Sequence, residues 1–151
     1  MALARHAYRA ILVLFFTFIL ASVTFAQAAE QTPTITVDEE VSVGDSVTVN
    51  EVVAPQPGFV VIQEELAGVP GPIIGQTVVP AGRSENVTVP LSEPVAPGTR
   101  LFATLFSDTE QPGVFEFPDA DTPVFNNNEP VRASFMAAGD EDIGGQEQVQ
   151  Q

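Results

Sequence analysis

Hydrophobic and polar residues beyond position 30 follow the short periods of β-strands rather than the spacing of helices. Thr34 to Val37 alternates with a period of two, and Ser46 to Val53 alternates and then becomes apolar. Such alternation is typical of a strand with one buried face. The run from Gly58 to Glu64 is almost continuously apolar, as expected of a central strand that is buried on both faces. No stretch of ten residues in this part repeats apolar residues at helical spacing, so the pattern predicts an all-β domain.

Eight strands are predicted in total. They cover residues 34–37, 46–53, 58–64, 73–79, 86–89, 100–106, 114–117 and 131–136. Proline and glycine separate most of them, because both residues favour turns over regular structure. Residues 69–72 (Val-Pro-Gly-Pro) are interpreted as a rigid turn, since proline fixes φ and glycine permits a left-handed step. Many short strands with regular turns predict an antiparallel two-sheet sandwich of immunoglobulin-like size, with a small closed barrel as the alternative.

The first segment has the three parts of a secretory signal peptide. Arg5 and Arg9 make its start basic, residues 10–26 are mostly apolar, and Ala26-Gln27-Ala28 forms a cleavage site of small residues. Residues 1–28 are therefore expected to form a signal peptide helix that is removed after Ala28. The alternative is an uncut helix that anchors the protein in a membrane, although the apolar run is short for a span of about 20 residues.

The rest of the chain divides into three parts. Residues 29–33 form a short linker, residues 34–137 form the predicted sandwich, and residues 138–151 form a tail rich in acidic residues and glutamine. The tail contains too little apolar surface to offset the loss of chain entropy on folding. We expect it to be disordered.

Charge and composition exclude several classes of function. The formal net charge of the 151 residues is -15, which argues against nucleic acid as a partner, because such binding requires Lys and Arg to neutralise phosphates. His6 and Tyr8 lie in the leader, and the remaining chain has no His, Lys, Cys, Tyr or Trp. A Ser–His–Asp or Cys–His centre, a thiolate or imidazole metal site and Schiff-base chemistry are therefore excluded for the mature chain. The remaining basic side chains, Arg83, Arg100 and Arg132, are expected to pair with surface acids.

Carboxylate chemistry is what this composition leaves available. The spacing of four acidic residues partly matches a calcium-binding loop, in which alternate carboxylates converge on the ion. These residues are Asp108, Glu110, Asp119 and Asp121. Pro112 occupies a position that normally supplies a ligand, so the pattern favours a solvated acidic hairpin over a calcium site. A pair of facing carboxylates in a groove would instead indicate a glycan hydrolase.

Several segments together resemble a known family. They are residues 58–62, 69–75, 80–82, 86–89, 101–108 and 113–118. The likeness covers Val47 to Met136 and is to secreted or cell-surface domains of haloarchaea and bacteria that have no assigned function. It implies an extracytoplasmic all-β module and no established activity. Members often have histidine where this chain has Gln63 and Phe106, so no functional residue is transferred from the family.

Asn86-Val87-Thr88 matches the acceptor sequence for N-linked glycosylation, within a predicted strand. The acidic excess has two explanations: it keeps a protein soluble in concentrated salt, or it attracts cations or a basic partner.

Taken together, these features lead to the hypothesis of a secreted or cell-surface, non-enzymatic module for surface interaction or structure, with no cofactor and an unknown extracellular partner. It would be at a membrane only if the leader is retained as an anchor. A calcium-dependent domain using residues 108–121 is the alternative, and a carboxylate-based glycan hydrolase is a weaker one.

Overall fold

The computed structural model describes residues 31–139, in which strands are joined by turns and loops and no residue is helical. In chain order the strands are β1 (Thr34–Thr36), β2 (Glu40–Ser42), β3 (Ser46–Ala54), β4 (Gly58–Leu66), β5 (Val69–Val79), β6 (Gly82–Pro90), β7 (Arg100–Ser107), β8 (Phe125–Asn126), β9 (Glu129–Pro130) and β10 (Arg132–Ala138). Within residues 31–139 no helix is long and apolar enough to cross a bilayer. The predicted leader, and the predicted tail apart from its first two residues, lie outside this part.

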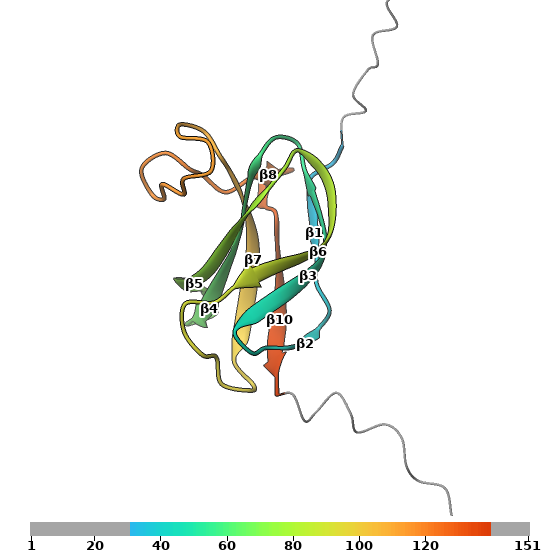
Figure 1. Ribbon diagram of the computed structural model, residues 1–151, viewed down its shortest axis with the longest axis vertical. Coiled ribbons are helices and arrows are strands. Elements are labelled where there is room, and N and C mark those ends of the chain that lie inside the picture. The colour runs from blue at the N-terminus through green and yellow to red at the C-terminus, as the bar shows by residue number, and fades with distance from the viewer. Residues whose placement is uncertain (1–30, 140–151) are drawn as a thin grey trace, which may run out of the picture.

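Two sheets pack face to face, as Figure 1 shows. One sheet has the order β1-β3-β6, and the other has the order β2-β10-β7-β4-β5. All neighbours are antiparallel except β2 and β10, which run parallel. The short β8–β9 hairpin forms a separate two-stranded sheet. The predicted all-β sandwich is therefore confirmed.

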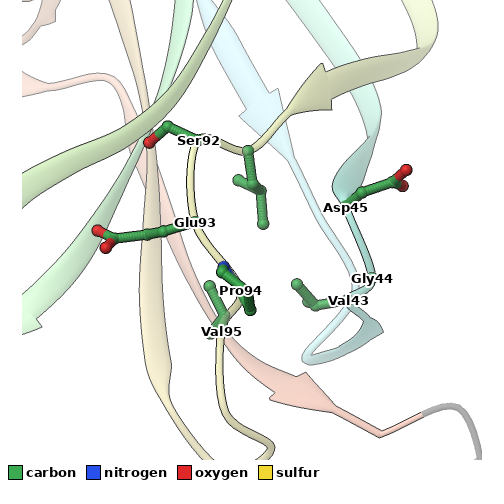
Figure 2. Close-up of a pocket in the computed structure, with 8 residues that line it drawn as sticks. Val43, Gly44, Asp45, Ser92, Glu93, Pro94 and Val95 are labelled. Carbon is green, nitrogen blue, oxygen red and sulfur yellow. The ribbon is translucent and has the colours of Figure 1, made fainter.

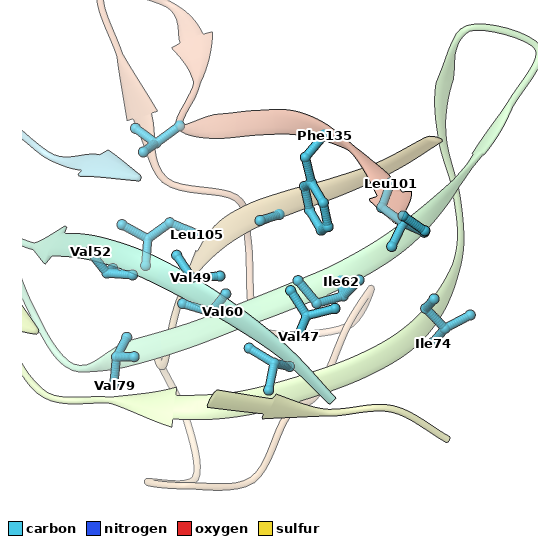
Figure 3. Packing of buried hydrophobic residues seen from close by; sticks show 14 of the residues in the cluster. Val47, Val49, Val52, Val60, Ile62, Ile74, Val79, Leu101, Leu105 and Phe135 are labelled. Carbon is cyan, nitrogen blue, oxygen red and sulfur yellow. The ribbon is translucent and has the colours of Figure 1, made fainter. Parts of the chain in front are cut away.

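The space between the sheets is filled by hydrophobic side chains, nearly all of them aliphatic. The buried residues of this core include Val47, Val49, Val52, Val60, Ile62, Ile74, Val79, Leu101, Leu105 and Phe135 (Figure 3). Complete burial of one such side chain contributes about 1.5–3 kcal/mol. Strand alternation places these residues inward because successive side chains point to opposite faces of a sheet.

The central strands β4 and β7 are also covered on their outer face. Phe59, Val61 and Phe106 are almost fully buried there, and Ile73 and Phe115 pack against them. This second cluster explains why both strands are nearly continuous apolar runs. A strand buried on both faces has no solvent-facing positions for polar residues.

The pairing of β3 with β6 contains a break that reverses which positions face inward. Val47 and Val49 are fully buried, and the next buried residues are Val52 and Ala54, so the spacing changes from two residues to three. Opposite this break, Asn86 has a positive φ of 52°. Asparagine tolerates this left-handed conformation better than most residues. This break explains why the alternation of polar and apolar residues in β3 gives way to consecutive apolar residues toward its end.

The prediction of a rigid turn at residues 69–72 was wrong, because these residues form the beginning of β5. The turn lies instead at Ala67 and Gly68, whose φ values are 55° and 84°. Two successive positive φ values are typical of the tight turn that matches the twist of a two-stranded hairpin. The prolines at positions 70 and 72 are tolerated because β5 is an edge strand of its sheet.

The strand predicted at residues 114–117 is absent, since this segment is part of the loop after β7. Its alternating sequence, Val-Phe-Glu-Phe, turns one aromatic face toward the outer side of the sheet without joining it. The very short strands β2, β8 and β9 were not predicted. β8 and β9 have two residues each, which is too few to show a period.

Candidate functional site

The acidic loop, residues 108–121, leaves the end of β7 and carries all four predicted metal ligands. In Figure 1 it is the orange excursion that projects from the sandwich before β8. Two backbone turns shape it: the N–H of Val114 donates to the carbonyl of Gln111, and the N–H of Ala120 donates to the carbonyl of Glu116. The loop is therefore held in place by hydrogen bonds within itself.

Asp121 is the organising side chain of this loop. It is fully buried, with 0% of its surface exposed. Its Oδ1 accepts from the backbone N–H of Thr109 at 3.1 Å, and its Oδ2 accepts from the backbone N–H of Glu116 at 2.7 Å. Hydrogen bonds to a charged acceptor are stronger than neutral ones. The carboxylate thus joins the two ends of the loop to its middle.

The other three predicted ligands do not converge with Asp121. Asp108 accepts from the backbone N–H of Gly113 at 2.6 Å through its Oδ2, which closes the first turn. Glu110 and Asp119 are exposed. Over residues 31–139, no three acidic side chains come together in an arrangement that could hold a metal ion. The geometry explains Asp108 and Asp121 as turn-forming groups, and calcium binding here stays a prediction without structural support.

Glu116 has the one carboxylate oxygen in the loop that is buried without a hydrogen-bond partner among the described residues, Oε2. Its Oε1 accepts from the side-chain amide of Gln111 at 2.9 Å. A single free oxygen is too few for calcium, which takes six to eight oxygen ligands.

The acidic loop is fastened to the sandwich by aromatic contacts. The Phe115 ring lies edge-on to Phe59 and Phe106, with centroid distances of 5.2 and 5.4 Å. Phe117 also packs edge-on against Phe106, at 5.3 Å, although 46% of its surface is exposed. These contacts hold the loop over the outer face of β4 and β7.

Gln63 and Phe106, where members of the resembled family often have histidine, are both structural in this chain. The Gln63 side-chain amide donates to the carbonyl of Gly71 at 3.1 Å, and its oxygen accepts a hydrogen bond from the Thr104 hydroxyl at 3.4 Å. The first bond joins β4 to β5 where their register shifts, and the second joins β4 to β7. Phe106 is 2% exposed beneath the acidic loop.

A shallow notch at the edge of the sandwich carries two acidic side chains. This edge notch has a volume of about 380 Å³ and lies between the start of β3 and the segment that follows β6. It is lined by Val43, Gly44, Asp45, Leu91, Ser92, Glu93, Pro94 and Val95 (Figure 2). The N–H of Leu91 donates to the carbonyl of Asp45 at 2.9 Å, so backbone pairing fixes its two walls. Sequence reasoning missed it, because the two walls are more than 40 positions apart in the chain.

The two carboxylates of the edge notch do not form a catalytic pair. Figure 2 shows Glu93 and Asp45 extending to opposite sides, away from each other, with aliphatic side chains between them. A glycosidase needs two carboxyl groups that face the same bond from either side. The arrangement gives no support to the glycan hydrolase alternative.

Residues 33–137 match the profile of a domain of unknown function, DUF7282, and the chain belongs to that family. No curated protein and no solved structure matches the chain. The resemblance to a family without an assigned function is thus confirmed, whereas its extracytoplasmic location stays a prediction.

Proposed function

We propose that this DUF7282 domain is an exported, non-catalytic module that acts by contact with a partner outside the cytoplasm. The observation that carries the proposal is the dispersal of its only ionisable acid–base groups. Between residues 31 and 139 these are carboxylates and three arginines. No three of the acidic side chains in this part meet in an arrangement that could hold a metal ion, and the two of the edge notch extend away from each other. General acid–base catalysis near neutral pH requires a titrating group that is positioned against a substrate.

The surface also indicates the chemistry of the partner. Arg83 and Arg100 are already paired with acids, Arg83 with Glu51 and Glu85 and Arg100 with Glu65. Most remaining acids are exposed and unneutralised, so the field of the domain is negative. Such a field repels nucleic acid and favours a basic protein surface. Contact with a membrane would follow only if the leader were kept as an anchor.

Export is tested by fractionating cells that express the full chain and sequencing the amino terminus of the protein recovered. The expected result is a protein outside the cytoplasm that begins at Ala29. A protein found only in the cytosol with its leader intact would overturn the proposal. A protein in the membrane fraction with its leader intact would support the anchored form.

The absence of catalysis is tested on the mature domain with a panel of glycan substrates at several pH values. We expect no steady turnover. Turnover that Asp45→Asn or Glu93→Gln abolishes would establish the hydrolase instead, and turnover that survives both would point to carboxylates elsewhere. Either positive result would overturn the non-catalytic part of the proposal.

A further inference from the structure

The break in the pairing of β3 and β6 brings four polar side chains together on the outer surface of the three-stranded sheet. They belong to Asn50, Glu51, Glu85 and Asn86. Three of the four are engaged. The Asn50 amide donates to Asp38 at 3.2 Å and its oxygen accepts from the Asp38 N–H at 3.1 Å, while Glu51 and Glu85 both pair with Arg83.

Asn86 is the exception in this group. Its side chain is exposed and has no hydrogen-bond partner among the residues that the structure describes. Thr88, two positions further along β6, is exposed as well, and Val87 between them turns toward the core. Because Asn86 is in the left-handed conformation, its amide stands at a kink in the strand. β6 is also an edge strand of its sheet, so no neighbouring strand covers that side.

We infer that Asn86 is the acceptor of an N-linked glycan. The triplet Asn86-Val87-Thr88 supplies the required amide, a middle residue other than proline and the hydroxyl, and no other asparagine of the chain has this pattern. The inference rests on the proposed export, because the modification is typical of secreted proteins. The positive φ at position 86 would by itself explain why an asparagine is present there. It does not explain the exposed threonine at position 88, which the acceptor triplet requires.

The reaction requires a lipid-phosphate-linked oligosaccharide as the donor. The Asn86 side-chain nitrogen forms a bond to the anomeric carbon of the first sugar and loses a proton. The bond from that carbon to the phosphate oxygen breaks, and the lipid phosphate leaves with the electron pair. The glycan would stand on the edge of the three-stranded sheet, where a large hydrated group blocks edge-to-edge pairing with another chain.

The test is the mass of the protein isolated from its native host, with tandem mass spectrometry of the peptide that contains Asn86. Thr88→Ser keeps the acceptor triplet, whereas Thr88→Val and Asn86→Asp remove it, and aspartate tolerates the left-handed conformation. We expect the wild type and Thr88→Ser to exceed the mass of the mature sequence by that of a glycan on Asn86. The other two variants are expected to have the sequence mass.

Each remaining outcome contradicts the inference. A leaderless, exported wild type with unmodified Asn86 would overturn it and leave the export proposal intact. Retention of the leader in the cytosol together with unmodified Asn86 would overturn both. Added mass that persists in Asn86→Asp would place the modification on another residue.

Discussion

The buried carboxylate of Asp121 accepts the backbone N–H of Glu116 at 2.7 Å, across five positions of the acidic loop. The same side chain accepts the N–H of Thr109 through its other oxygen. A fully buried carboxylate is costly unless hydrogen bonds compensate for lost hydration. These two bonds supply that compensation, so Asp121 fixes the shape of the loop.

Replacing Asp121 with asparagine tests this role. The Nδ2 group of the amide would face a backbone N–H, so one donor would lose its acceptor inside the protein. We expect the free energy of unfolding to fall by about 2 kcal/mol, the usual cost of losing a hydrogen bond to a charged group. Denaturant unfolding measures it, with Asp119→Asn as the exposed control. Equal, small effects in both variants would show that Asp121 does not organise the loop.

The aromatic attachment of the loop leads to a second prediction. Phe115→Ala removes edge-on contacts to Phe59 and Phe106 and exposes part of the outer face of β4 and β7. Because Phe115 is only partly buried, we expect a loss of about 2 kcal/mol, below the 3–5 kcal/mol of a fully buried phenylalanine. Phe125, which is 58% exposed, is the matched control. Its change to alanine should cost less than about 0.5 kcal/mol, and a loss as large as that of Phe115→Ala would contradict the assignment.

Most of the strands that sequence patterns predicted correctly are long enough to show a period, and the three-residue β1 was found because the alternation continues to Val37. β4 and β7 were found because burial on both faces makes them continuously apolar. Residues 114–117 were misinterpreted because alternation reports only that one side faces apolar neighbours. A loop that lies on a sheet satisfies that condition as well as a strand does.

The candidate site was less predictable than the fold. The spacing of Asp108, Glu110, Asp119 and Asp121 left converging carboxylates as the alternative to a solvated acidic hairpin. Sequence spacing does not show whether an oxygen faces water, an ion or a backbone N–H. Asp108 and Asp121 bind N–H groups of their own loop. The edge notch depends on contacts between distant segments, which no local pattern reports.

Close approach of β4 and β7 makes Gly58 necessary. A Cβ at this position would overlap the backbone carbonyl oxygen of Phe106 on the neighbouring strand. Backbone cannot move aside as a flexible side chain does, so we expect Gly58→Ala to destabilise the domain by at least about 2 kcal/mol. At Gly44 no atom lies within 4 Å of the place that a Cβ would take, so Gly44→Ala is the control and should be nearly neutral. Comparable melting temperatures for the two variants would refute the packing argument.

Calcium should have no effect on the stability of the mature domain. The oxygens of Asp121 are occupied by backbone N–H groups, and Glu110 and Asp119 lie exposed rather than gathered around a common point. We expect the same melting temperature in millimolar calcium and in EDTA, and no heat of binding in calorimetry. A calcium-dependent rise that Asp119→Asn and Glu110→Gln remove would establish the calcium-binding alternative.

Salt, in contrast, should stabilise the domain. The described part carries three arginines against a large excess of carboxylates, and its ion pairs are those of Arg83 and Arg100 with acids on the surface. Repulsion among the unpaired acids opposes the compact state, and it is screened at distances beyond about 3 Å in 1 M salt. Exposed ion pairs are worth at most about 1 kcal/mol each, so their weakening cannot reverse the gain. We therefore expect the melting temperature to rise between low and molar NaCl.

A variant with fewer charges separates this repulsion from a general effect of salt on hydrophobic burial. Glu39→Gln, Glu110→Gln and Asp119→Asn together remove three exposed charges and leave the core and the loop hydrogen bonds in place. If repulsion is the cause, the triple variant melts at a higher temperature in low salt and gains less from added NaCl than the wild type. A wild-type melting temperature that stays flat or falls would contradict the repulsion argument. An identical salt dependence in the two proteins would assign the stabilisation to burial instead.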